Sequence, residues 1–413
     1  MIVLFLAALV SLASAGIKED HEVKDLPGLN GTLSFKQYAG YFSISPTRKL
    51  AYWLLESQGN PNKDPLMLWL DGGPGCSSLS GILLENGPFR ISTAGKPDGV
   101  LYENPHAYNK FANVLYLEAP AGVGFSRLDD DKFSFTDNET ATDNLKFLQE
   151  FLKAYSEYEN RDFFISGISY AGCYVPHLAD TIINHKDEIK LNLKGIAMGN
   201  AITDQKWLNQ LSIPNTAFYG ILRLNKLNEW TNEYCPTGFE NFCGKEVAQS
   251  PTANVPINRY DFADQCGPDC EEPFMQAFLN NHKVKDALHF EHKHWTHCNE
   301  SLMNTFFQNL CDDAEALVRD LLAHKIRVLY YFGTTDNRVP FISGDFFARK
   351  IGGNGELTHW FVNGVYSGTK THYPNNITFT TVLGAGHPSA KHKPQQVANV
   401  IQKFISGDDN WDA

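Results

Sequence analysis

Long apolar runs and positive charge are both scarce in this sequence. No segment reaches about 18 uninterrupted apolar residues, the length that crosses a bilayer as a helix, so the sequence predicts no membrane span. The 35 Lys and Arg residues are outnumbered by 47 Asp and Glu residues, which gives a formal net charge of −12. A surface of that sign repels phosphate backbones, which excludes nucleic acid as an expected partner. Internal repeats and low-complexity stretches are absent as well, so neither a repeat array nor a disordered chain is expected.

The N-terminus begins with a short apolar run that ends in small residues. Its sequence is MIVLFLAALVSLASA, and charged residues follow from Lys18 onward. Ala13 and Ala15 form a small-x-small cleavage signal, so residues 1–15 are predicted to be a signal peptide. A buried N-terminal strand or helix is the alternative interpretation. A signal peptide directs the chain into the secretory pathway, and the expected location is therefore secreted or lysosomal.

The cysteines and the Asn-x-Ser/Thr sequons are both consistent with a protein of the secretory pathway. Eight cysteines, an even number, suit disulfides in an oxidising compartment, although the sequence alone does not fix their pairing. Four Asn-x-Ser/Thr sequons predict glycosylation, and their asparagines are Asn30, Asn138, Asn299 and Asn376.

Short apolar runs alternate with helical patterns, which predicts an α/β fold with a mostly parallel sheet. The expected strands are Leu50–Leu55, Leu66–Leu70, Val114–Leu117, Phe163–Ser166, Gly195–Met198, Arg327–Phe332 and Ile377–Val382. Helices are expected over Glu139–Tyr158, directly after Ser169, and over Pro394–Ile405.

One long stretch breaks this alternation. Residues 205–320 contain few strand-like runs but six of the eight cysteines: Cys235, Cys243, Cys266, Cys270, Cys298 and Cys311. The sequence predicts that this stretch is a disulfide-stapled cap inserted into a core made of residues 16–204 and 321–413. A second domain with its own function is the alternative.

The clearest chemical signal surrounds Ser169. An apolar strand runs into Gly167-Ile168-Ser169-Tyr170-Ala171-Gly172 and then into a helical pattern. This arrangement is typical of a nucleophile elbow, in which a serine hydroxyl is exposed on a sharp turn between a strand and a helix. The alternative is an ordinary tight turn with an inert serine.

A serine nucleophile needs a base and an acid that orients the base. Asp336 follows the strand that ends at Phe332, and His387 follows the strand that ends at Val382. Because Ser, Asp and His then occur in the order that α/β hydrolases use, these three residues are predicted to form a catalytic triad.

An oxyanion hole requires backbone N–H groups, which Gly73 and Tyr170 are expected to supply. Gly73 lies in the glycine-rich run Asp71-Gly72-Gly73-Pro74-Gly75-Cys76-Ser77-Ser78, which follows an apolar strand. The run is not a phosphate-binding loop, because no Lys follows it.

The run Trp-Leu-x-Gly-Gly-Pro-Gly-Cys-Ser-Ser resembles the signature of the serine carboxypeptidase family, in the branch that contains cathepsin A and yeast carboxypeptidase Y. The similarity extends over nearly the whole chain after residue 25. It includes Leu26-Pro27-Gly28, Tyr38-Ala39-Gly40-Tyr41, Glu85-Asn86-Gly87-Pro88, Glu118–Ser126, Ser169–Gly172, Gly199-Asn200 and Gly384–His387.

The resemblance implies an α/β-hydrolase fold with an inserted cap and release of C-terminal residues from peptides, usually at acidic pH. It also implies a Cys76–Cys298 disulfide, with Asn299 as a glycan site beside it. Two cap disulfides would use Cys235, Cys243, Cys266 and Cys270. Cys173 and Cys311 receive no assignment.

The chain departs from the family at the residues that bind the substrate's terminal carboxylate. Of the family's Asn and two Glu, only Glu85 is retained; Asp71, beside Gly72, replaces the Asn and Ile168 replaces the second Glu. One hypothesis is that Asp71 and Glu85 share a proton, so that the carboxylate is bound mainly at low pH. The rival hypothesis is that an anionic Asp71 favours neutral or cationic leaving groups such as peptide amides.

Three functions follow from these residues. The first is a serine carboxypeptidase acting on peptide or protein C-termini. The second is an amidase, esterase or acyltransferase on the same scaffold, and the third is a secreted binding or chaperone-like protein with an idle site. No cofactor is expected, and a homodimer is left open.

A histidine cluster suggests a metal site, but a solvated segment is the preferred interpretation because no His-Glu-x-x-His pattern is present. Its members are His289, His292, His294 and His297.

Overall fold

The computed structural model describes residues 16–29, 33–92, 100–129, 135–235, 258–264, 270–306, 311 and 314–412. The predicted signal peptide lies outside these residues, as do Asn30, Cys243 and Cys266. The chain divides into two compact units. The first unit comprises Met1–Ser166, His177–Ile196 and Glu271–Gln308, and the second comprises Gly167–Pro176, Ala197–Cys270 and Asn309–Ala413.

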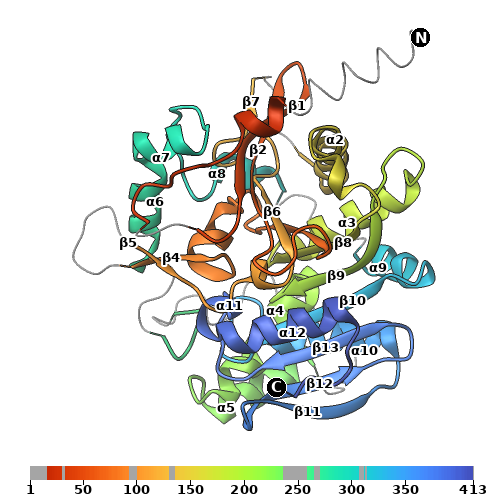
Figure 1. The fold of residues 1–413 in the computed structure, drawn as a ribbon. Coiled ribbons are helices and arrows are strands. Elements are labelled where there is room, and N and C mark those ends of the chain that lie inside the picture. The colour runs from red at the N-terminus through yellow and green to blue at the C-terminus, as the bar shows by residue number, and fades with distance from the viewer. Residues whose placement is uncertain are drawn as a thin grey trace. The chain divides into compact units, whose positions relative to one another are not determined.

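Strands from the N-terminal part of the chain form the sheet of the first unit (Figure 1). They are β1 (Gln37–Ser45), β2 (Arg48–Leu55), β3 (Leu66–Leu70), β6 (Asn113–Leu117) and the short β7 (Arg127–Leu128). Their order is β1-β2-β6-β3, with β7 paired to β2; β3 and β6 are parallel, whereas the other pairs are antiparallel. Every residue of β3 and β6 is buried, as expected for strands covered on both faces. A separate two-stranded sheet consists of β4 (Phe89–Ser92) and β5 (Val100–Glu103).

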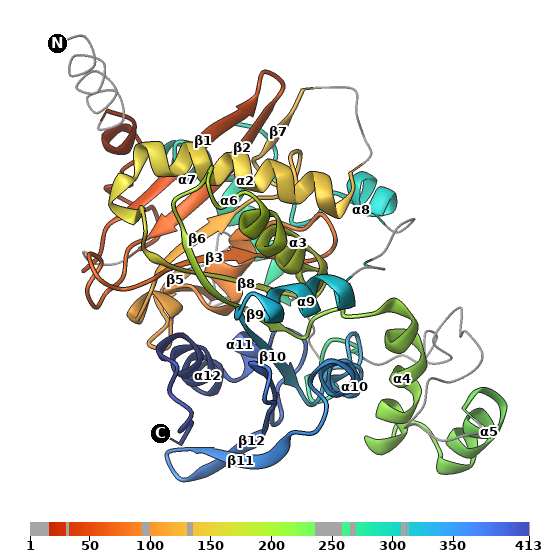
Figure 2. The same cartoon turned by 90° about the vertical axis from the view of Figure 1, so that its right-hand side faces the viewer.

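Helix α2 (Asp137–Ala154) runs alongside β1 (Figure 2). Thr136 caps it by accepting a hydrogen bond from the N–H of Glu139 at 3.2 Å. The rings of Phe147 and Phe151 pack edge-on against Phe42 of β1, with centroids 5.6 and 6.4 Å away. Leu145, Leu148 and Leu152, which recur at helical spacing in the sequence, are buried as well, so that spacing predicts part of the face that the helix buries.

The other helices of the first unit are short. They are η1 (Gly81–Glu85), η2 (Tyr108–Lys110), η3 (Ser156–Tyr158), α6 (Glu272–Asn280), α7 (His282–Ala287) and α8 (Glu300–Phe306). Helix α3 (Ala171–Asn184) begins in the second unit and ends in the first.

The second unit contains the C-terminal strands. They are β10 (Arg327–Gly333), β11 (Glu356–Val362), β12 (Val365–His372) and β13 (Ile377–Val382), in the order β10-β13-β12-β11. The pair β10-β13 is parallel, and β12 is antiparallel to both of its neighbours. Strands β8 (Asp162–Ile168) and β9 (Asn192–Gly199) begin in the first unit and end in the second. The helices are α4 (Gln205–Phe218), α5 (Leu224–Tyr234), α9 (Ala314–Ala323), α10 (Phe341–Gly352), α11 (Ser389–His392) and α12 (Pro394–Ser406).

Each of the seven strands expected from the sequence is present, and the α/β class is confirmed. The described part of residues 205–320 contains helices and no strand. That residues 205–320 form an inserted cap, with the boundaries given above, stays a prediction. In the described ranges, no helix is both long enough and apolar enough to cross a membrane.

Candidate active site

Ser169 occupies a turn between β8 and α3 in the second unit. Its φ is +62°, a left-handed conformation that costs a non-glycine residue about 1–3 kcal/mol. The turn is held in place because the Ser169 N–H donates to the carbonyl of Gly199 at 3.0 Å, while the Ser169 carbonyl accepts from Ile202 at 2.9 Å. A Cβ at Gly172 would lie 2.2 Å from the carbonyl oxygen of Ile202, so only glycine allows this approach. The local geometry is the strand–turn–helix that the sequence pattern predicts.

Asp336 and His387 meet above the ends of the parallel strands β10 and β13. Nδ1 of His387 lies 2.7 Å from Oδ2 of Asp336, and both side chains are buried. The other carboxylate oxygen, Oδ1, accepts the backbone N–H groups of Arg338 at 2.6 Å and Val339 at 3.1 Å. These donors stabilise the negative charge of Asp336 and fix its direction towards the imidazole.

Asn200 connects the acid to the histidine loop. Its amide donates to Oδ2 of Asp336 at 2.7 Å, and its carbonyl oxygen accepts from the hydroxyl of Ser389 at 2.6 Å and from Gly333 N–H at 3.2 Å. The backbone of Asn200 is left-handed, with φ +40°. The Gly-Asn motif of the sequence signals this position, but nothing in the motif indicates the contact with Asp336.

A disulfide between Cys173 and Cys311 links the first turn of α3 to the segment before α9. Both cysteines are buried, and both are left unassigned by the sequence analysis. Cys235 and Cys270 are also disulfide-bonded.

The predicted oxyanion loop follows β3 in the first unit. Gly73 has φ +108°, and a Cβ there would lie 2.7 Å from the sulfur of Cys76, so the turn requires glycine. Cys76 forms a disulfide with Cys298, the pairing that the family resemblance implies. Tyr170 lies in the second unit, immediately before α3. The assignment of the Gly73 and Tyr170 N–H groups to an oxyanion hole stays a prediction.

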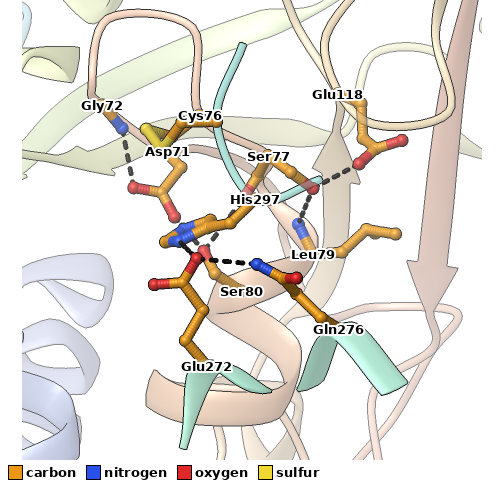
Figure 3. The surroundings of a disulfide bond; sticks show 11 residues. Asp71, Gly72, Cys76, Ser77, Leu79, Ser80, Glu118, Glu272, Gln276 and His297 are labelled. Carbon is orange, nitrogen blue, oxygen red and sulfur yellow. Dashed lines mark hydrogen bonds and ion pairs between the residues drawn. A yellow bond between two sulfur atoms is a disulfide. The ribbon is translucent and has the colours of Figure 1, made fainter. Parts of the chain in front are cut away.

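The side chain of Asp71 is buried beside this disulfide (Figure 3). Oδ1 accepts the N–H of Gly72 at 2.7 Å, and Oδ2 accepts the hydroxyl of Ser80. Figure 3 shows the carboxylate next to the imidazole of His297, with Glu272 on the other side of the ring.

His297 therefore lies between two carboxylates. Its Nδ1 is 3.5 Å from Oε1 of Glu272. Burial by itself lowers the pKa of His297, but the hydrogen bond to Glu272 and the charges of Asp71 and Glu272 outweigh it, so that the pKa is raised above its ordinary value. The same hydrogen bond lowers the pKa of Glu272. The two carboxylates thus favour the protonated form of the imidazole next to Asp71.

A metal ion is a poor occupant for this cluster. The ligand atoms of Cys76, His297 and Cys298 lie within 4.8 Å of one another. The two sulfurs, however, are bonded to each other in a disulfide, so neither is a thiolate that could bind a metal. His289 and His292 of the sequence cluster contact Glu22 and Asp286 instead, and His294 is exposed.

The other residues predicted to bind substrate are also buried. Glu85 ends η1, where its backbone carbonyl accepts from Arg90 at 2.6 Å, and it is 7% exposed. Ile168, the last residue of β8, is 4% exposed. Their contact with a substrate stays a prediction.

Glu118 forms a buried acid next to the glycine-rich loop. Its carboxylate accepts the hydroxyl of Ser77, the N–H of Phe125 at 2.6 Å and the indole N–H of Trp295 at 3.1 Å. Burial outweighs these donors and raises the pKa of Glu118 to about 7. A Cβ at Gly124 would overlap its oxygen at 1.9 Å, so this packing requires glycine.

The described sequon asparagines differ in exposure. Asn138 and Asn376 are exposed, whereas Asn299 is half-buried and its amide donates to the carbonyl of Gly122 at 3.1 Å. Glycosylation of each stays a prediction.

Comparison with known proteins identifies the scaffold. A family model described as serine carboxypeptidase matches residues 27–407. Lysosomal protective protein of Mus musculus is 31% identical over an alignment that covers 98% of this chain and 98% of that protein. Serine carboxypeptidase-like 37 of Arabidopsis thaliana is also 31% identical, with coverage of 94% and 86%.

Among solved structures, Kex1(delta)p, a prohormone-processing carboxypeptidase from Saccharomyces cerevisiae, superposes with a TM-score of 0.80. The match covers 95% of this chain and 96% of that chain at 24% identity. The α/β-hydrolase fold predicted from the sequence is thereby confirmed.

Proposed function

This chain belongs to the serine carboxypeptidase family, and from that premise we propose that it releases C-terminal residues from peptides through an acyl-enzyme intermediate. Family membership makes it a serine hydrolase of the peptidase class. The observation that supports this proposed reaction is the buried 2.7 Å contact between Nδ1 of His387 and Oδ2 of Asp336. An imidazole that donates its Nδ1 proton to a carboxylate presents a basic Nε2, which is what a serine nucleophile needs.

In the first half-reaction, Nε2 of His387 takes the proton from the Ser169 hydroxyl as Oγ attacks the carbonyl carbon of the last peptide bond. The negative charge that develops on the carbonyl oxygen is stabilised by the N–H groups assigned to Gly73 and Tyr170. Cleavage of the C–N bond leaves the acyl group on Ser169, and the proton on Nε2 passes to the departing amine.

In the second half-reaction, water replaces the amine. Nε2 of His387 accepts a proton from the water as its oxygen attacks the ester carbonyl. The bond to Ser169 breaks, and the proton returns to Oγ. Asp336 keeps the imidazole in one tautomer throughout and stabilises its positive charge.

The proposal also requires a way to bind the terminal carboxylate of the peptide substrate. Asp71 cannot donate a hydrogen bond when ionised, so a proton shared with Glu85 is one way to bind a carboxylate at low pH. The raised pKa of His297 favours a protonated imidazole beside Asp71, which adds positive charge and N–H donors where the family's Asn is missing. That charge supports binding of a carboxylate directly, without requiring the proton shared by Asp71 and Glu85.

The rival hypothesis has an observation in its favour too. Asp71 and Glu272 place two acidic side chains around one imidazole, so the cluster contains more acidic than basic groups. An excess of ionised acidic groups favours leaving groups without a carboxylate, such as peptide amides.

Hydrolysis of one blocked dipeptide, as its free acid and as its amide, measured from about pH 4 to about pH 8, distinguishes the two hypotheses. Carboxypeptidase recognition predicts a higher kcat/KM for the acid at low pH, with a preference that declines as the pH rises. Preference for the amide at every pH would reject the shared proton and support an amidase.

The third function, an idle site, has a separate test. An active triad predicts covalent labelling by a fluorophosphonate, confined to Ser169 and abolished in Ser169→Ala. Lack of labelling in the wild-type protein would favour the binding or chaperone-like role.

For location, we propose the secretory pathway. The leader-like residues 1–15 and the even number of cysteines support it, as does the similarity to a protein named lysosomal protective protein. Microscopy of the full-length chain with a C-terminal tag, compared with a variant lacking residues 2–15, tests this location.

A further inference from the structure

A short stretch of the second unit lies against the loop that carries Asp336. We call Arg259–Phe262 the strap. The N–H of Asn337 donates to the carbonyl of Arg259 at 2.9 Å. At the other end of the strap, the N–H of Phe262 donates to the carbonyl of Thr335 at 3.0 Å. The residues on either side of Asp336 are therefore bonded to the same four-residue segment.

The strap also touches the loop that carries His387. The N–H of His387 donates to the carbonyl of Tyr260 at 2.5 Å, and the Tyr260 ring packs edge-on against the imidazole, with centroids 5.4 Å apart. A Cβ at Gly386 would lie 2.5 Å from both Cβ of Asp261 and the carbonyl oxygen of Tyr260. Glycine at this position is thus what allows the histidine loop to lie against the strap.

One side chain of the strap, Asp261, connects the two loops directly. It is 4% exposed. Its Oδ1 accepts the hydroxyl of Thr335 at 2.5 Å, and its Oδ2 lies 3.2 Å from Nδ1 of His392. The same Nδ1 accepts the N–H of Gly386 at 2.9 Å. Asp261 thus bonds to the residue before Asp336, and its second oxygen lies beside the His392 nitrogen that also contacts the residue before His387.

The two contacts of His392 exclude each other at any moment. One ring nitrogen cannot accept from Gly386 and donate to Asp261 at the same time. A neutral ring with its proton on Nε2 bonds to Gly386, whereas a proton on Nδ1 bonds to Asp261. A glutamine at this position would offer an acceptor and a donor together, so it is the conservative replacement for either state.

We propose that Asp261 is a positioning residue of the catalytic machinery, which keeps the loops of Asp336 and His387 in fixed positions relative to each other through its bond to Thr335 and its contacts with Gly386 and His392. The inference rests on the proposed function, because it takes Asp336 and His387 as the catalytic acid and base. Its physical basis is that a reacting group must be held within a fraction of an ångström. A misplacement of about 1 Å costs about 100-fold in rate.

The test uses variants of the full chain, with Asp187→Ala as the matched control, since Asp187 is an exposed acid in the first unit. Asp261→Ala is expected to lower kcat and the rate of fluorophosphonate labelling by about 10- to 100-fold with little change in KM. His392→Ala is expected to show a smaller fall and His392→Gln to restore the rate. The control is expected to match the wild type.

A purely structural role makes a different prediction. In that case the melting temperature of Asp261→Ala would fall while kcat, measured well below melting, stayed at the wild-type value; this result would overturn the proposal. If Asp261→Ala does not fold, Thr335→Val and the two His392 variants carry the test. Equal labelling rates in Thr335→Val, His392→Ala and the wild type would then overturn it, and reduced rates rescued by His392→Gln would support it.

Failure of the proposal can be separated from failure of the proposed function. Labelling reports the reactivity of Ser169 without depending on which peptide or ester is the substrate. Absence of labelling in the wild type would overturn the triad, and the role of Asp261 with it. Normal labelling in the wild type and in every variant would overturn the role of Asp261 alone.

Discussion

His297 shows how the surroundings of one residue change what it can do. Burial by itself favours a neutral histidine, whereas the carboxylates of Glu272 and Asp71 raise the pKa of this one above its ordinary value. The sequence places it in a run of four histidines, where solvent exposure is the simplest interpretation. Only the fold brings α6 and the loop after β3 to either side of the ring.

We expect His297→Gln to raise KM for a peptide acid by about 10-fold while leaving KM for the matching amide nearly unchanged. The reason is that the variant removes a positive charge which only a carboxylate uses. Because the pKa of His297 is raised, the difference between acid and amide should persist above the ordinary titration range of histidine and disappear at higher pH. Steady-state kinetics on the acid and amide pair measure it.

His292→Gln is the matched control, since that histidine is exposed and pairs with Asp286. An equal rise in KM for both substrates would show that His297 only shapes the pocket.

At the scale of elements, the Cys173–Cys311 disulfide fixes the start of α3, which follows the Ser169 turn directly. Replacing both cysteines with alanine is expected to lower the free energy of unfolding by about 2–5 kcal/mol, since a cross-link between distant residues restricts the unfolded chain. Chemical denaturation of wild type and variant under non-reducing conditions measures this loss. A variant as stable as the wild type would contradict it.

Elements with a strong local pattern could be predicted from the sequence, and those defined by neighbours could not. β3 and β13 are apolar or β-branched throughout and are buried on both faces, so composition alone indicates them. β11 exposes most of its side chains at the sheet edge, and its polar residues resemble a loop. It is a strand because β12 supplies its hydrogen bonds.

The same division holds for the candidate site. Ser169 and His387 lie in glycine-containing motifs, where a side chain at Gly172 or Gly386 would collide with a neighbouring segment. The sequence therefore indicates both loops. Asp261 and His392 have no such motif, because their importance comes from contacts between segments far apart in the chain. Nor does spacing predict the Cys173–Cys311 pair, whose members are separated by 138 positions.

For the whole molecule, stability against pH is set by buried groups that act in opposite directions. The pKa of Glu118 is raised by burial to about 7, so between its ordinary value and pH 7 the native state binds a proton that the unfolded state does not. Its contribution therefore falls as the pH rises through that window. The pKa of His21 is lowered, chiefly by burial, to about 4, so its contribution falls as the pH drops below the ordinary histidine range.

These two contributions oppose each other between about pH 4.5 and about pH 6.5, so in the wild-type protein each partly hides the other. His21→Asn should unmask the Glu118 contribution: stability would fall with rising pH, by about 3 kcal/mol across the window for a shift of this size. Glu118→Gln should reveal the opposite slope, with stability falling as the pH drops. Its stability is expected to be lower at every pH, because the single amide oxygen cannot accept from donors that bond to both oxygens of Glu118. Unfolding by urea at several pH values gives the free energy of unfolding as a function of pH. If this dependence has the same slope in the wild type and both variants, neither Glu118 nor His21 controls it.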